Sequence, residues 1–412
     1  MQRPLRVIII GAGMGGLSAA CALRQRGIEA EVYERAPSLG EVGAGVQLGP
    51  NGVKVMSALG LEKVLLERGF EPNRTLTLNW DDASVRQSGS MREYAARFGS
   101  SYITIHRADL HRIFVEGLGN ARVHLGRSCT GVETIDRTSI ARFSDGSEVE
   151  ADIIVGADGI RSTIRRDLFG ETAPRFTNSI AWRCMIDIRH VPDRVGPGGS
   201  VFLTSGDHVS WYGPNGQVIC YPIGDGSVLN IFAGHSSESW VDESWSIPSS
   251  EQELLAAYKG WNGALLGMFE HVEHCFKWGI FDRNPIREWT RGRITLLGDA
   301  AHPTMPNLAQ GANMAIEDGY VLARSVAEHP ADPQHQGDRP PTAELGGRRA
   351  GARTGRAGGA RPDRRRRRAR GRALTEGRAA GSESFGRDLI EAQRKRIGLL
   401  LTAVVVNFGL GC

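Results

Sequence analysis

Apolar and polar positions at the start of the chain follow the pattern of a β–α–β unit. A strand is expected over Arg6–Ile10, where a continuous apolar run is typical of a parallel strand buried on both faces. An alanine- and leucine-rich stretch then predicts a helix that Gly27 ends, and Glu29–Tyr33 predicts the next strand. The length of this segment fits two parallel strands joined by a helix.

The same kind of pattern predicts the architecture of the remaining chain. Buried strands are expected at Ile153–Val155 and Ile294–Leu297, and Gly311–Val326 has the spacing of a helix. Between them, residues 177–290 carry short aromatic and β-branched runs that Gly, Pro and Asn interrupt, which favours a mostly β domain. The predicted fold class is therefore α/β, with a three-layer, Rossmann-like domain and an inserted, mostly β domain.

The Rossmann-like domain is expected to be discontinuous. The expected ranges are 1–75, 100–175 and 280–330 for the Rossmann-like domain, and 76–99 and 176–279 for the inserted domain. Residues 332–380 form a low-complexity, Arg- and Gly-rich segment with almost no large apolar residues, so we expect it to be disordered. Residues 382–412 are expected to form a helical segment.

Charge is concentrated in the low-complexity segment. The chain has a net charge of +4, but residues 339–378 hold 14 Arg against 3 acidic residues, and the rest holds 36 Lys and Arg against 43 Asp and Glu. The folded body is therefore mildly acidic. Three interpretations of the segment stay open: a solvated linker, a nucleic-acid-binding arm, or a frameshifted stretch of a GC-rich gene. No aromatic residues separate the arginines for base stacking, so no nucleic-acid partner is expected.

Cysteine spacing and hydropathy indicate the cellular compartment in which the protein is expected. The six cysteines form no CxxC pair, which argues against a zinc site or a disulfide framework, and no metal is expected. No signal peptide is recognised before the first strand. The longest apolar run, Ile397–Leu410, is shorter than the ~20 residues of a membrane-spanning helix. We therefore expect a cytoplasmic protein without a transmembrane segment, as a monomer or homodimer.

A glycine-rich loop predicts a dinucleotide site between the first strand and the first helix. Gly11 permits a tight turn, Gly13 lets the backbone approach a pyrophosphate, and Gly16 lets the helix pack closely on the strand. Glu34 lies 23 residues after Gly11, the spacing at which a carboxylate accepts hydrogen bonds from a ribose.

Two further motifs follow the later strands. Gly156–Ser162 includes Asp158 in a turn, and Gly298–Pro303 places Asp299 at a strand end, where it could hold a polyol hydroxyl. The second motif continues through Pro306 to a helix that begins at Gly311, whose N–H groups would point into a cleft.

In this order and at these distances, the three motifs resemble those of the group A FAD-dependent aromatic hydroxylases. The likeness covers roughly residues 5–330. Gly43–Asn51 resembles the segment that passes the flavin ring, and His106–Leu110 resembles the segment whose arginine contacts the cofactor. Ala181–Cys184 and Tyr221-Pro222 resemble the salicylate and 3-hydroxybenzoate hydroxylase branch.

The resemblance implies an FAD-dependent monooxygenase that uses NAD(P)H and O2 to hydroxylate a small, anionic hydroxyaromatic substrate through a flavin C4a-hydroperoxide. Arg183 is implied to pair with a carboxylate or phenolate, and Tyr221 to orient the substrate hydroxyl or relay its proton. Residues implied to bind FAD are Gly11, Gly13, Gly16, Glu34, Arg35, Val46, Arg107, Asp158, Asp299, Gly311, Ala312 and Asn313. Residues expected in the substrate pocket are Gln47, Gln217 and Pro306.

One position departs from the hydroxylase branch. Gln217 stands four residues before Tyr221, where the branch usually carries a histidine, and glutamine cannot take a proton at neutral pH. This argues against a 3-hydroxybenzoate-type base mechanism. His208 is expected on a surface loop, and His302 is expected to be structural rather than a base. Two alternative functions stay open: a flavin-dependent epoxidase of an apolar alkene, and a non-catalytic FAD-binding paralogue with a disrupted C-terminus.

Overall fold

The computed structural model describes residues 3–40, 44–119, 122–136, 138–170, 173–240, 247–272 and 274–328. The predictions for residues 332–380 and 382–412 lie outside the described residues. Among the helices that the structure describes, none has the length and apolarity needed to cross a membrane.

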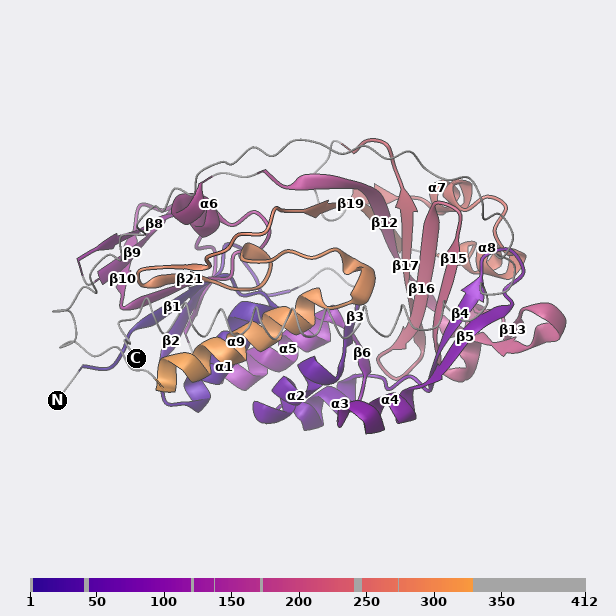
Figure 1. Ribbon diagram of the computed structural model, residues 1–412, viewed down its shortest axis with the longest axis horizontal. Coiled ribbons are helices and arrows are strands. Elements are labelled where there is room, and N and C mark those ends of the chain that lie inside the picture. Colours follow the sequence, from indigo (N-terminus) through magenta and orange to yellow (C-terminus); the bar gives the residue numbers. More distant parts are fainter. Residues whose placement is uncertain are drawn as a thin grey trace, which may run out of the picture.

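A six-stranded sheet forms the centre of the Rossmann-like domain (Figure 1). All its neighbouring strands are parallel except the edge pair β20 and β21. In spatial order the strands are β20 (Thr290–Arg291), β21 (Ile294–Leu296), β11 (Ile153–Gly156), β1 (Val7–Ile10), β2 (Ala30–Tyr33) and β7 (Val123–His124). The strands expected from the continuous apolar runs are all present in this sheet.

Alternate side chains of β1 build the two outer layers of the domain. Val7 and Ile9 pack against one layer of helices, whereas Ile8 and Ile10 pack against a small antiparallel sheet and one short helix. This three-layer arrangement confirms the predicted α/β fold class. The helical layer comprises α1 (Met14–Gln25), α5 (Arg107–Leu118) and α9 (Gly311–Glu328), and the opposite layer comprises β8 (Cys129–Ile135), β9 (Thr138–Phe143), β10 (Glu148–Ala151) and α6 (Thr163–Phe169).

An eight-stranded sheet stands at the other end of the elongated molecule (Figure 1). Its strands are antiparallel except for the parallel pair β4 and β15. In spatial order they are β18 (Ile247–Ser249), β19 (His274–Asp282), β12 (Arg175–Asp187), β17 (Val228–Ser236), β16 (Gly216–Ile223), β15 (His208–Gly213), β4 (Arg74–Asn79) and β5 (Val85–Ser90).

The two faces of this second sheet have different partners. On one face, Trp182 and Trp211 pack against side chains of α7 and α8 in an apolar core. On the other face, Ile219 and Tyr221 of β16 border a cavity toward the Rossmann-like domain. The other elements within the described ranges are β3 (Gly45–Leu48), β6 (Ile103–His106), β13 (Arg194–Val195), β14 (Val201–Phe202), α2 (Pro50–Ala58), α3 (Glu62–Arg68), α4 (Met91–Phe98), α7 (Glu251–Ala257), α8 (Gly263–Phe269) and several short 3-10 helices.

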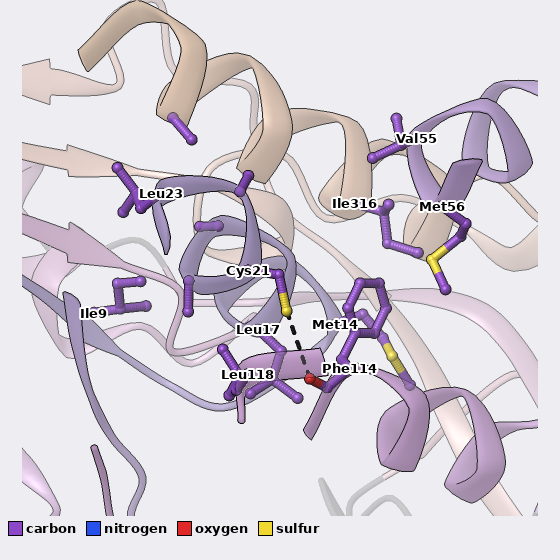
Figure 2. Close-up of a cluster of buried hydrophobic side chains, with 14 of the residues drawn as sticks. Ile9, Met14, Leu17, Cys21, Leu23, Val55, Met56, Phe114, Leu118 and Ile316 are labelled. Carbon is purple, nitrogen blue, oxygen red and sulfur yellow. Dashed lines mark hydrogen bonds between the residues drawn. The ribbon is translucent and has the colours of Figure 1, made fainter. Parts of the chain in front are cut away.

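Helices α1 and α9 approach closely in the core of the Rossmann-like domain. Figure 2 shows Leu17 and Cys21 of α1 in an apolar cluster that also contains Ile316 of α9. The Ser18 hydroxyl donates a hydrogen bond of 2.8 Å to the carbonyl oxygen of Ile316. A Cβ at Gly319 would lie 2.5 Å from the backbone nitrogen of Ala19, so only glycine permits this crossing.

We therefore expect Gly319→Ala to destabilise the protein. The obstructing atoms belong to the backbone of α1 and cannot rotate away, so the helices must separate, and overpacking of this kind costs about 1–3 kcal/mol. The measurement is the free energy of unfolding in denaturant. Gly267→Ala in α8 is the matched control, because a Cβ there meets nothing within 4 Å and alanine favours a helix. Equal stability of the two variants would contradict the prediction.

Candidate active site

A cavity of about 320 Å³ lies between the Rossmann-like domain and the eight-stranded sheet. Ten of the predicted site residues line it: Gly13, Val46, Gln47, Arg107, Arg183, Tyr221, Asp299, Pro306, Gly311 and Ala312. The other predicted residues, which do not line it, are Gly11, Gly16, Glu34, Arg35, Asp158, Gln217 and Asn313. The structure thus brings together residues that are up to about 300 positions apart in the sequence.

The glycine loop leaves the start of α1 open to this cavity. Gly11 has a φ of +109°, and a Cβ there would lie 2.3 Å from the carbonyl oxygen of Ala157. A Cβ at Gly16 would lie 2.0 Å from the carbonyl oxygen of Gly11. At Gly13, by contrast, a Cβ would meet nothing within 4 Å, and no side chain caps the helix that follows. The uncapped N–H groups and this open space fit the diphosphate of a dinucleotide.

Glu34 is held in place directly behind the glycine loop. Its two carboxylate oxygens accept backbone N–H groups of Ala12, at 2.7 Å, and of Ala36, at 2.9 Å. Each oxygen keeps a further acceptor position for a ribose hydroxyl. The neighbouring Arg35 is exposed.

Asp158 has a different position from the one expected of a cofactor ligand. Its carboxylate accepts a hydrogen bond of 2.5 Å from the Ser162 hydroxyl and one of 2.8 Å from the backbone N–H of Thr163, so it stabilises the turn before α6. The backbone on either side, at Ala157 and Gly159, lines the cavity. The turn itself, rather than the carboxylate, therefore faces the site.

Arg107 and Asp299 bring opposite charges to the Rossmann side of the cavity. Arg107 is the first residue of α5, and burial lowers its pKa, although the charge of Asp299 opposes this shift. Burial raises the pKa of Asp299, and the nearby His302 and Arg107 oppose that shift. A cation and a polar acid at this position suit the diphosphate and hydroxyl groups of a dinucleotide.

His302 and Asp318 join the Asp299 segment to α9. The His302 Nε2 atom lies 2.5 Å from Asp318 Oδ2, which also accepts the backbone N–H of Gly298 at 2.9 Å. Burial alone would lower the pKa of His302, but the charge and hydrogen bond of Asp318 outweigh it, so the pKa is raised. The pair fixes the position of Asp299, which agrees with the structural role expected for His302.

Asn313 is buried beneath the cavity and connects α9 to the segment around β3. Its Oδ1 accepts the Gly49 N–H at 3.0 Å, and its Nδ2 donates to the carbonyl oxygens of Gln47, at 3.0 Å, and Ala309, at 2.8 Å. Its side chain therefore positions the first turn of α9, where Gly311 and Ala312 face the cavity.

Arg183 contributes a cation from the eight-stranded sheet. Its guanidinium lies 4.2 Å from the ring centroid of Trp278. Burial and repulsion from Arg107 lower the pKa of Arg183 to about 10, while Tyr221 opposes the shift, so Arg183 stays charged at neutral pH. Among the residues that the structure describes, no carboxylate forms an ion pair with Arg183. The guanidinium is enclosed by protein except where it borders the cavity.

Two sequence-based expectations about the side of the cavity that the eight-stranded sheet forms were wrong. His208 lies in β15, not on a surface loop, and its ring stacks on Tyr221 with a centroid distance of 5.6 Å and an interplanar angle of 1°. Gln217, expected in the pocket, instead lies beyond the cavity, where its carbonyl oxygen accepts the Tyr258 hydroxyl at 3.2 Å.

Sequence reasoning also missed Tyr102, whose hydroxyl donates a hydrogen bond to Gln47 Oε1. One signal could have found His208. The apolar alternation of Val209 and Trp211 places His208 on the strand face opposite the core.

Comparisons with known proteins agree with this geometry. A family model described as FAD binding domain matches residues 4–332. The chain is 35% identical over 331 residues to 6-hydroxynicotinate 3-monooxygenase of Pseudomonas fluorescens, covering 80% of this chain and 84% of that protein. It is 38% identical over 333 residues to 3-amino-4-hydroxybenzoate 2-monooxygenase PtmB3 of Streptomyces platensis, covering 81% and 82%. The crystal structure of Klebsiella pneumoniae HpxO with FAD and uric acid superposes with a TM-score of 0.70 at 27% identity, covering 79% and 80% of the two chains.

The open space at Gly13 provides a test of whether the start of α1 binds a diphosphate. Gly13→Ala should leave the free energy of unfolding of the flavin-free protein within about 1 kcal/mol, because the φ of −74° suits alanine and its Cβ meets nothing. The methyl group would project into the diphosphate path, so FAD affinity should fall by about tenfold or more, equivalent to ~1.4 kcal/mol. Flavin titration of the apoprotein measures this. Gly40→Ala is the control, since Gly40 is equally open but lies outside the cavity. Unchanged FAD affinity in Gly13→Ala would contradict diphosphate binding at the start of α1.

Proposed function

The chain belongs to the FAD binding domain family of flavoprotein monooxygenases, and from this premise we propose that it hydroxylates a small hydroxyaromatic acid, with NAD(P)H and O2 as co-substrates. The chemistry supplied by bound FAD is reduction by NAD(P)H and activation of O2 for insertion of one oxygen atom. The protein's residues then have to bind the ring, orient it, exclude water and control the proton of its hydroxyl group.

We propose that the Rossmann side of the cavity holds FAD. The open backbone at Gly13 and the start of α1 would receive the diphosphate, and Glu34 would bind the adenosine ribose. Arg107 and Asp299 would hold the diphosphate and ribityl region. Gly311 and Ala312, at the start of α9, would face the flavin ring.

The unpaired charge of Arg183 is the observation that carries the proposed substrate class. A cation enclosed by protein is costly unless an anion pairs with it, and no carboxylate of the described residues does so. A guanidinium matches a carboxylate through two parallel hydrogen bonds. The substrates named for the two monooxygenase relatives, 6-hydroxynicotinate and 3-amino-4-hydroxybenzoate, each combine a ring hydroxyl with a carboxylate.

The other residues of this wall suit an aromatic ring. Ile219, Phe232 and Trp278 provide apolar surface along the cavity, which supports ring binding and exclusion of water. Tyr221 lies beside Arg183 and has its pKa raised to about 12 by burial, so it is a protonated hydroxyl at neutral pH. We propose that Arg183 pairs with the substrate carboxylate and Tyr221 hydrogen-bonds its ring hydroxyl.

The two alternative functions are not favoured. An epoxidase of an apolar alkene would have no use for an enclosed, charged Arg183, and the monooxygenase relatives act on hydroxyaromatic acids. A non-catalytic FAD-binding paralogue would still need the glycine loop, but it would be under no requirement to keep Arg183 and Tyr221 in the same cavity.

We also propose a reducing compartment, the cytoplasm, for this enzyme. The five cysteines among the described residues are free thiols, and this supports the proposal. An assembly state of monomer or homodimer stays a prediction.

The direct test is a screen of hydroxyaromatic acids for faster NAD(P)H oxidation by the FAD-loaded enzyme, with product analysis to separate hydroxylation from peroxide release. A hydroxylated product from at least one acid is expected. If no acid in a broad panel accelerates NAD(P)H oxidation, the proposed function is wrong.

Arg183→Gln should reduce kcat/KM for the accepted acid by about 10²-fold, since it leaves the substrate carboxylate buried without its partner. Bound FAD should be unchanged, and a phenol that lacks the carboxylate should lose much less. Arg175→Gln is the matched control, because Arg175 lies on the same strand in an exposed ion pair with Asp282. Equal losses for the acid and the neutral phenol would show that Arg183 does not recognise the carboxylate.

A further inference from the structure

Asn230 is a polar side chain of the cavity that neither the sequence motifs nor the proposed function uses. It lies in β17, borders the cavity and is 2% exposed. Its pairing partner in β16 is Tyr221. A Cβ at Gly45 would lie 2.7 Å from Asn230 Cγ and 2.7 Å from Tyr221 Cε2. Gly45 of β3 therefore packs directly on the two neighbouring side chains.

A hydrogen bond from Gly45 determines which way the Asn230 amide points. The backbone N–H of Gly45 donates to Asn230 Oδ1 at 2.6 Å. Because a backbone N–H can only donate, the amide atom that faces it must be the oxygen, and a flipped amide would bring two donors together. The amide nitrogen, Nδ2, therefore points away from Gly45.

The two N–H groups of Asn230 Nδ2 have no acceptor within the part of the chain that the structure describes. Nδ2 is not one of the fully enclosed polar atoms without a partner, so it reaches open space. The open space that Asn230 borders is the cavity. A donor left unpaired in such an enclosed position costs free energy, so a ligand that brings an acceptor oxygen to Nδ2 gains a hydrogen bond.

Strand register separates this donor from the guanidinium of Arg183. Arg183 pairs with Phe232 across β12 and β17, and Asn230 lies two residues away along β17, which is about 7 Å. The guanidinium also lies against Trp278 of β19, on the side of β12 away from β17. With a carboxylate on Arg183, Asn230 and Tyr221 lie where a substituent on the far side of the ring would be.

We infer that Asn230 is a substrate-binding residue: its Nδ2 donates a hydrogen bond to the ring hydroxyl oxygen of a bound hydroxyaromatic acid, beside Tyr221. The inference rests on the proposed function and adds a second donor for this oxygen. An amide N–H suits the oxygen in its protonated and its ionised form. The position of Asn230 favours acids whose hydroxyl lies across the ring from the carboxylate, as in the substrates named for the two monooxygenase relatives.

The test compares ligands with and without the ring hydroxyl on the FAD-loaded enzyme, in the absence of NAD(P)H. The flavin absorbance change gives dissociation constants for 3-amino-4-hydroxybenzoate and for 3-aminobenzoate, which lacks the hydroxyl. The pair 6-hydroxynicotinate and nicotinate provides a second comparison. We expect the wild type to bind a hydroxy acid more tightly than its analogue.

Asn230→Asp replaces the donor with an acceptor and keeps an oxygen for the Gly45 N–H. The added charge repels the carboxylate of the hydroxy acid and of its analogue alike, so the ratio of their dissociation constants reports the lost hydrogen bond. We expect the preference for the hydroxy acid to fall by about tenfold, with bound FAD unchanged. Asn262→Asp is the matched control, because Asn262 Oδ1 also accepts a backbone N–H, that of Ala264 at 3.0 Å, but lies outside the cavity. It should keep the wild-type preference.

Asn230→Leu makes the same comparison without a new charge, and it decides the test if Asn230→Asp does not fold with FAD. Its preference for the hydroxy acid should also fall by about tenfold. Equal losses for the hydroxy acid and its analogue in either variant, or no preference in the wild type, overturn the inference. Loss of bound FAD in both variants would assign the amide to the cofactor and overturn it as well.

Failure of the proposed function has a different signature. In that case no hydroxyaromatic acid binds to the wild type or accelerates its NAD(P)H oxidation. Failure of this inference alone leaves binding and hydroxylation intact, and the contribution of the ring hydroxyl to binding is then independent of Asn230.

Discussion

Backbone contact at the first turn of α1 is the constraint on which the rest of the structure depends. Gly16 packs on the carbonyl oxygen of Gly11, and Gly11 packs on that of Ala157, so a side chain at either glycine would separate β1, α1 and β11. Gly319 brings α9 equally close to α1. Because of these contacts, both helices begin at the edge of the same cavity.

The cavity joins two surfaces that each contribute an arginine. Arg107 and Arg183 approach it from opposite sides, and their repulsion contributes to the lowered pKa of Arg183. Two cations can share a small enclosed space when anions enter between them. A diphosphate on one side and a substrate carboxylate on the other would relieve this repulsion, so cofactor and substrate binding are electrostatically compatible in one site.

The polar residues around Tyr221 show why residue type alone does not predict which side chains line a site. Gln217 stands where the sequence resemblance led us to expect a histidine, yet it does not line the cavity. His208, which precedes an ordinary apolar alternation, stacks directly on Tyr221. The side chain that reaches a site depends on strand register and on the curvature of the sheet, and a displacement of two positions along β16 is enough to remove a residue from the cavity.

The sequence by itself determined the dinucleotide fold and the position of its glycine loop. Gly11, Gly13, Gly16 and Glu34 act over short distances along the chain, and each depends on a local backbone conformation that glycine spacing and apolar runs reveal. Only the tertiary structure decided which polar side chains gather around Tyr221, because Gln47, Tyr102, His208 and Tyr221 belong to segments that meet through long-range strand pairing. The hydrogen bonds between these side chains depend on which atoms face one another, and no single segment contains that information.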